Sequence, residues 1–80
     1  MRDDQEERMA RDRKAAFERL AAKRVPAAVD AIRLVGNLSF RMNYRYTREE
    51  VDEIFEAIGS EVDAARERFD EGLRMEEGML

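Results

Sequence analysis

Residues 47–69, TREEVDEIFEAIGSEVDAARERF, decide the fold class of this chain. Thr47 is followed three residues later by Glu50, the spacing of a capping box, in which each side chain accepts a hydrogen bond from the other residue's backbone amide. Tyr46 before the cap and Val51 after it occupy the positions of a hydrophobic staple. This stretch therefore predicts an amphipathic helix that begins at about residue 48.

The apolar side chains of this helix keep to one face. They are Val51, Ile54, Phe55, Ile58, Val62, Ala65 and Phe69. Acidic residues fill the first turns, where the helix dipole favours negative charge. Gly59-Ser60 interrupts the stripe, so a break in the helix there is an open alternative, and Gly72 is expected to be the C-cap. We therefore expect a helix over about 48–71.

The N-terminal half carries an apolar stripe with the same helical spacing. Its residues are Phe17, Ala21, Val25, Ala28, Ile32 and Val35. Pro26 removes a backbone hydrogen bond and clashes with the preceding turn, so the alternatives are one long helix kinked at Pro26 and two helices broken near Arg24 and Val25. We favour the kinked helix because a break usually resets the phase of the stripe. Gly36-Asn37 should end it, since both residues tolerate a left-handed C-cap.

The connection over 37–46 has a different period. Leu38, Phe40, Met42, Tyr44 and Tyr46 alternate with Ser39, Arg41, Asn43 and Arg45. This alternation is typical of a half-buried strand, which would need to pair with its symmetry mate in a dimer. The other interpretation is an ordered loop whose apolar residues cover the end of a helical bundle. We favour the loop because strand signals this short depend strongly on context.

Together these patterns predict a mainly all-α protein. We expect a helical hairpin with a long first helix, an extended connection over 37–46 and a second helix over about 48–71. Residues 1–80 should form a single domain, with residues 1–8 and 73–80 frayed. Because two helices cover only one side of each other, we expect a homodimer in which four helices bury both stripes.

The net charge of −4 hides an uneven distribution. Residues 1–24 carry +2, residues 25–48 carry +3 and residues 49–80 carry −9, which sum to −4. No acid lies between Asp30 and Glu49, so the connection is a basic island in an acidic protein. Its candidate partner- or nucleic-acid-binding residues are Arg41, Asn43, Tyr44, Arg45 and Arg48. Tyr and Arg are the residue types that interfaces use as anchors.

An acidic helix face is the other candidate surface. Its residues are Glu49, Asp52, Glu53 and Glu56. They belong to a run from Glu49 to Asp63 with seven carboxylates and no base, which would imitate the phosphates of a nucleic acid. The simpler interpretation is a solvated helix face.

Catalysis has little support in the composition. The chain has no His and no Cys, so an ordinary catalytic triad, a thiol nucleophile and an imidazole base are all excluded. It also has no Gly-rich phosphate loop. The acid pairs Glu49/Glu53 and Asp52/Glu56 have the spacing to hold a hard cation, but we expect them to be exposed. We therefore predict a non-enzymatic protein without catalytic residues, cofactor or metal.

The chain shows no membrane or export signal. No apolar run approaches the roughly 20 residues that span a bilayer, and the first residues, MRDDQEERMARDRK, contain no apolar segment. We expect a cytoplasmic protein that does not contact membranes.

The C-terminal half resembles the ribbon-helix-helix repressors. Residues 41–45, RMNYR, are similar to their DNA-reading strand, residues 47–58 to their first helix, and Gly59-Ser60 to the turn that follows. This resemblance implies a DNA-binding regulator in which Arg41, Asn43 and Arg45 contact bases. Arg pairs with guanine and Asn with adenine through bidentate hydrogen bonds in the major groove.

A longer segment, AIRLVGNLSFRMNYRYTREEVDEIF at residues 31–55, resembles small uncharacterised helical proteins of phages, plasmids and other mobile elements. Small anti-CRISPR proteins are also encoded on such mobile elements, and the resemblance implies an accessory protein or inhibitor that binds a host nucleic-acid-handling complex. We therefore rank a protein partner first. The ribbon-type DNA-binding regulator is the alternative.

Overall fold

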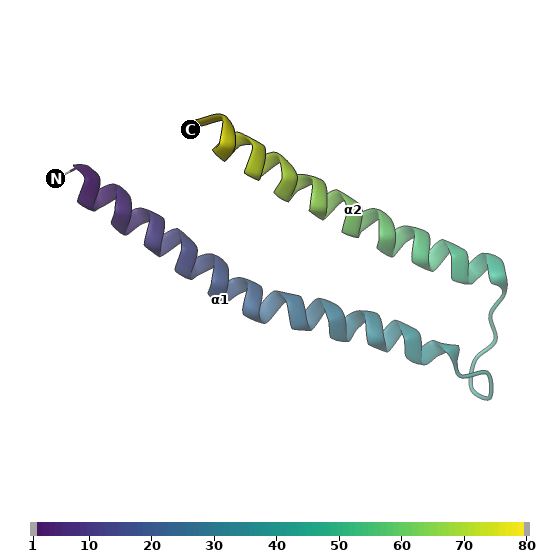
Figure 1. Cartoon of the computed structure of the whole chain (residues 1–80). Coiled ribbons are helices and arrows are strands. Elements are labelled where there is room, and N and C mark those ends of the chain that lie inside the picture. The colour runs from purple at the N-terminus through teal and green to yellow at the C-terminus, as the bar shows by residue number, and fades with distance from the viewer. Residues whose placement is uncertain (1, 80) are drawn as a thin grey trace. The chain divides into compact units, whose positions relative to one another are not determined.

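The structure is a computed structural model that describes residues 2–79, with the side chains of residues 4–78. The described residues form two long helices, α1 (Arg2–Gly36) and α2 (Arg48–Met79), and a short 3₁₀ helix, η1 (Asn37–Ser39), that follows α1 directly (Figure 1). No strand occurs between residues 2 and 79. The predicted all-α class is therefore confirmed.

α1 continues without a break through Pro26. Proline has no amide hydrogen, so the carbonyl of Ala22 loses its usual helical partner, and helices commonly bend at such a position. Figure 1 shows a bend near the middle of α1. The preference for one long, kinked helix over two separate helices is thus confirmed.

The end of α1 lies where the sequence places it, but its geometry differs from the prediction. Gly36 has φ −59° and ψ −30°, which is right-handed helical backbone. No residue in the described part of the chain has a positive φ. The predicted left-handed C-cap is therefore wrong. α1 instead tightens into η1, and the hydrogen bonds of a 3₁₀ helix, which join residues three apart, are a common way to satisfy carbonyls in the last turn of a helix.

α2 begins at Arg48 as predicted and is longer than predicted. It continues through Gly59 and Ser60, so the alternative of a break there is not realised. It also continues through Gly72 to Met79, which makes the predicted C-cap wrong. A glycine in a helix costs only about 1 kcal/mol relative to alanine, and good helix formers follow Gly72. An ion pair between Arg74 and Glu71, with 2.8 Å between Nη2 and Oε2, supports the turn around this glycine.

The predicted fraying concerns the first residues of α1 and the last residues of α2. Residues 2–8 and 73–79 are helical in the structure. Fraying is an opening equilibrium of helix ends, so it stays a prediction for these segments. Residues 1 and 80 lie outside the described part of the chain.

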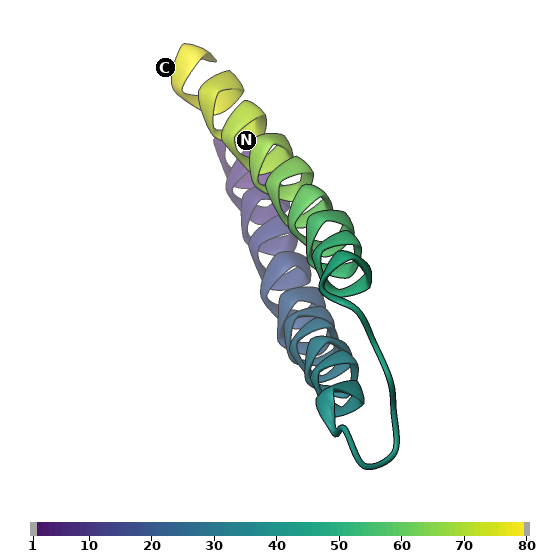
Figure 2. The ribbon, with the colours of Figure 1, turned by 90° about the vertical axis from the view of Figure 1, so that its right-hand side faces the viewer.

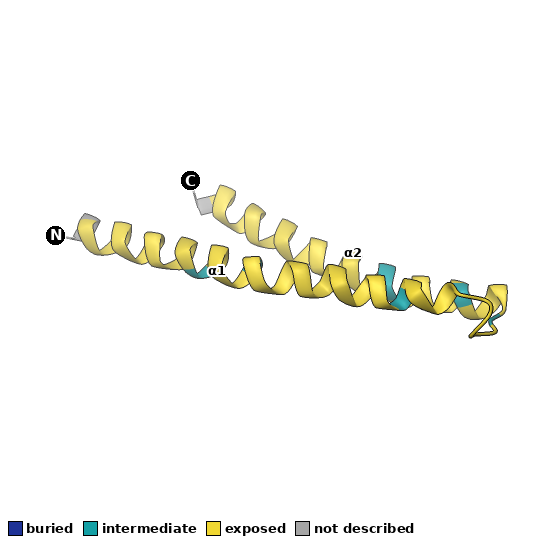
Figure 3. Ribbon diagram, turned by 90° about the horizontal axis from the view of Figure 1, so that it is seen from below, coloured by how far each residue is buried: buried dark blue, intermediate teal, exposed yellow. Residues whose placement is uncertain are grey.

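The chain divides into an N-terminal unit, Met1–Tyr44, and a C-terminal unit, Arg45–Leu80, each built on one helix. No described side chain is buried in either unit, and only scattered positions are half-buried (Figure 3). The single domain and the dimeric bundle stay predictions. Neither helix, over the residues described, has a stretch both long and apolar enough to cross a membrane.

Candidate functional site

The start of α2 is fixed by a complete capping box. The backbone amide of Thr47 donates to Oε1 of Glu50 at 2.9 Å, and the amide of Glu50 donates to Oγ1 of Thr47 at 3.1 Å. The amide of Val51 then donates to the Thr47 carbonyl at 3.1 Å and closes the first helical turn. Tyr46 and Val51, the predicted staple residues, are both half-buried. These reciprocal bonds fix the residue at which α2 begins.

The connection between η1 and α2 forms a turn and not a continuous extended segment. The Phe40 carbonyl accepts hydrogen bonds from the amides of Asn43 and Tyr44, both at 3.1 Å. Figure 2 shows the chain looping here before α2 begins. The loop interpretation is the one observed, because the turn interrupts the alternation that a strand would require. Phe40, which begins this turn, has extended backbone with φ −72° and ψ 103°.

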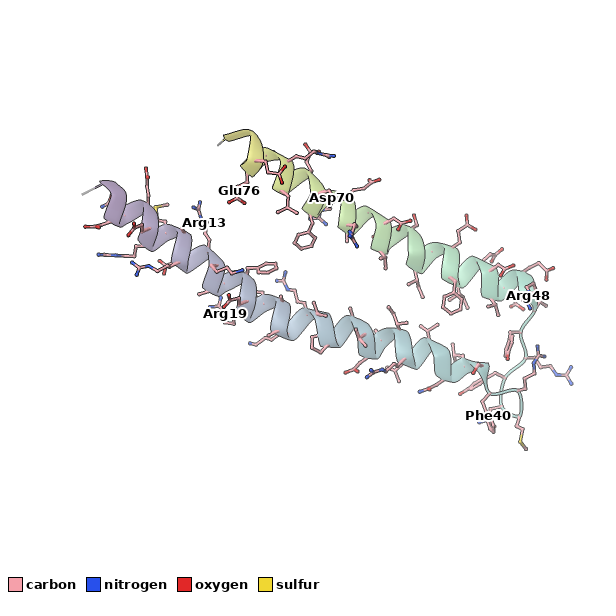
Figure 4. The ribbon with its side chains drawn as sticks, viewed as in Figure 1. Arg13, Arg19, Phe40, Arg48, Asp70 and Glu76 are labelled. Atoms are coloured by element: carbon pink, nitrogen blue, oxygen red, sulfur yellow. The ribbon has the colours of Figure 1, made fainter. Side chains whose placement is uncertain are left out.

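The predicted basic site is divided between the two units. Arg41, Asn43 and Tyr44 lie on the turn that ends the N-terminal unit, and all three are exposed. Arg45 and Arg48 belong to the C-terminal unit and are exposed as well. Figure 4 shows Phe40 on the connection and Arg48 where α2 begins. The structure therefore does not bring Arg41, Asn43 and Arg45 together as one row on a strand.

The acidic candidate residues share one side of α2. Glu49, Asp52, Glu53 and Glu56 follow helical steps of three and four, and all four are exposed as expected. Within the part of the chain that the structure describes, none of their side chains forms an ion pair or a hydrogen bond. No group of three acidic side chains in that part of the chain gathers closely enough to hold a metal ion. The acidic side is an unpaired, solvated charge surface.

The apolar side of α2 lies opposite these carboxylates. Phe55 is 53% exposed and Phe69 is 60% exposed. Val62 lies between them on the same face and is also exposed. An exposed apolar stripe of this length is a common mark of a protein interaction surface. α2 thus offers a partner an apolar stripe on one side and negative charge on the other.

α1 has an apolar surface that sequence reasoning missed. Leu20, Ala27 and Leu34 lie seven residues apart, so they share a side of the helix that differs from the side of Phe17 and Val25. Leu20 and Leu34 are exposed. The seven-residue spacing was the available signal. This spacing is hard to recognise because residues 20–36 are apolar around most of the helix. The stripe through Val25 also has helical spacing and accounts for many of the apolar residues in that segment.

Comparisons with known proteins do not assign the chain to a family. No family model, no curated protein and no solved structure matches it. The functional proposal therefore rests on the exposed faces of the two helices and on their charges.

Proposed function

We propose that the protein is a small non-enzymatic binding protein whose apolar helix faces are covered by a protein partner. The observation that carries this proposal is the exposed stripe of α2, which includes Phe55, Val62 and Phe69. Helices in proteins owe most of their stability to the packing of such a face and not to intrinsic propensity. A partner that covers the stripe removes apolar surface from water, which is the main favourable term in association.

The charges of α2 support a particular class of partner. Its exposed acidic side, with Glu49, Asp52, Glu53 and Glu56, complements a basic groove such as those that hold nucleic acids. The resemblance to small mobile-element proteins leads to the same class. The proposed function is therefore inhibition of a host nucleic-acid-handling complex, with α2 as the binding element.

The test is titration of the protein into a panel of purified RNA-guided DNA-binding complexes while target-duplex binding is measured. We expect DNA binding to fall at stoichiometric protein for a susceptible complex. Phe55→Glu should abolish the effect because it places a charge in the stripe. Ser60→Glu adds the same charge on the acidic side of α2 and is the matched control. The inhibitor role would be contradicted if no complex were affected, or if both variants behaved alike with helicity intact.

The alternative is a DNA-binding regulator that uses Arg41, Asn43 and Arg45. The observation that favours it is the basic, acid-free segment between Asp30 and Glu49, with Arg41 and Arg45 exposed. Titration against mixed duplex DNA at low and moderate salt tests it, because affinity from phosphate contacts falls steeply with salt. Salt-sensitive binding that Arg41→Ala/Arg45→Ala loses would make this the preferred function. An absence of binding at low salt would reject it.

A further inference from the structure

The apolar side chains of α1 form two faces. The first apolar face is the stripe that contains Phe17, Val25 and Ile32. The second apolar face consists of Leu20, Ala27 and Leu34, and at 3.6 residues per turn it lies roughly a third of a turn around the helix from the first. Leu20 is 36% exposed and Leu34 is 67% exposed. One neighbouring helix cannot cover both faces, so the second face needs a neighbour of its own.

Two opposite charges flank the second apolar face along the same edge. Lys23 and Asp30 are seven residues apart, so they project on the same side of α1. The Lys23 side chain has no ion pair or hydrogen bond within the described residues. Among the residues whose side chains the structure describes, Asp30 pairs only with its exposed neighbour Arg33, with 3.3 Å between Oδ1 and Nη1. Exposed pairs of this kind are weak, so the Asp30 carboxylate can accept a second cation.

We propose that the second apolar face is a homodimer interface in which α1 helices of two copies pack antiparallel, with Ala27 at the twofold axis. Leu20 of each copy then faces Leu34 of the other, and the small Ala27 side chains allow close approach of the helices. Lys23 lies four residues before Ala27 and Asp30 three residues after it, so Lys23 of one copy comes level with Asp30 of the other. Two symmetric ion pairs result.

The same charges favour the antiparallel over the parallel arrangement. Parallel packing in register would place the charged edges of the two copies on opposite sides of the interface, so Lys23 of one copy would form no ion pair with Asp30 of the other. Asp30 is also the one acid between Glu18 and Glu49, so no other carboxylate of that segment competes for Lys23. A second copy of this chain therefore fits the face in shape and in charge. The inference rests on the proposed role of apolar helix faces as protein-binding surfaces.

A charge-exchange experiment tests the interface. Sedimentation equilibrium should show that Lys23→Glu and Asp30→Lys each raise the dimer dissociation constant about tenfold, because each turns two attractive pairs into repulsive ones. The double variant Lys23→Glu/Asp30→Lys should recover to within about threefold of the original protein, since it restores both pairs in reverse. A monomeric original protein, single variants that dimerise normally, or a double variant without recovery would each overturn the proposal.

A cross-linking experiment tests the axis separately. The chain has no cysteine, so Ala27→Cys introduces a single thiol at the proposed axis, where two copies would bring their Cβ atoms within disulfide range. Diamide oxidation should link most of this variant into covalent dimers. Ala22→Cys, on another side of α1, should link far less. Equal linking of both variants would overturn the proposal. Failure here together with intact, Phe55-dependent inhibition would leave the proposed function standing.

Discussion

α1 and α2 are similar in length but present different surfaces to a partner. The N-terminal unit holds ten bases and seven acids, whereas the C-terminal unit holds five bases and twelve acids, so their net charges are +3 and −7 and sum to −4. α1 is apolar on two faces over residues 20–36, while α2 has one apolar stripe opposite an acidic side. α1 thus exposes apolar surface on two sides, and α2 exposes it on one.

The largest expected effect concerns the stripe of α2. If this stripe is covered in the assembled protein, Phe69→Ala should lower the free energy of unfolding by about 3–5 kcal/mol, the usual cost of removing a buried aromatic side chain. Glu67→Ala, on the acidic side, should change it by less than about 0.5 kcal/mol. Urea unfolding measures both. Equal costs would mean that no part of a second copy covers the stripe of α2 in the purified protein.

Pro26 distinguishes α1 from α2, which contains no proline between Arg48 and Met79. Pro26→Ala restores a backbone hydrogen-bond donor and should stabilise α1 by up to about 3 kcal/mol. Urea unfolding and circular dichroism should show a higher midpoint and more helix, and Gly36→Ala at the helix end provides a control with a smaller effect. A lower midpoint for Pro26→Ala would show that the assembly requires the bend in α1.

The capping box gives α2 a sharply defined start. Thr47→Ala removes the acceptor for the Glu50 amide and should cost about 1 kcal/mol of stability. Thr47→Ser keeps the hydroxyl and should cost only a few tenths of a kcal/mol. Thermal unfolding of the two variants measures the difference. Identical losses would mean that the hydroxyl bond contributes nothing to α2.

The smallest expected effect concerns the centre of α2. A Cβ atom at Gly59 would meet nothing within 4 Å, so Gly59→Ala should raise stability by about 0.8 kcal/mol through a lower backbone entropy of the unfolded chain. Gly72→Ala, which also has open space, should gain a similar amount. Destabilisation at Gly59 alone would reveal a partner packed closely against that point of α2.

Features that depend on neighbouring residues were predictable from the sequence. The Thr47/Glu50 box involves side chains three residues apart, and the structure reproduces both of its bonds. The helical phase across Pro26 correctly indicated a continuous α1. Such features need no knowledge of the rest of the fold.

Some sequence patterns are compatible with two local structures, and the incorrect predictions concern such patterns. Gly36 and Gly72 permit a left-handed cap but do not require one. Both have right-handed helical backbone in the structure, so the predicted C-caps are wrong. The alternation over 38–46 is compatible with a strand or a loop, and the favoured loop is the one observed, since the Phe40 carbonyl accepts hydrogen bonds from two amides of a turn. The basic site stays a prediction, which rests on residues that are close in sequence. Whether they act together depends on the placement of the two units, which no local pattern encodes.

We infer that these helices fold by association, and thermal unfolding at a series of protein concentrations measures whether they do. Circular dichroism should record a midpoint that rises by roughly 5 °C for each tenfold increase in concentration, because binding of a partner copy stabilises only the folded state. A cooperative transition whose midpoint does not change between micromolar and millimolar protein would contradict the account. That result would mean that one chain covers its own apolar faces.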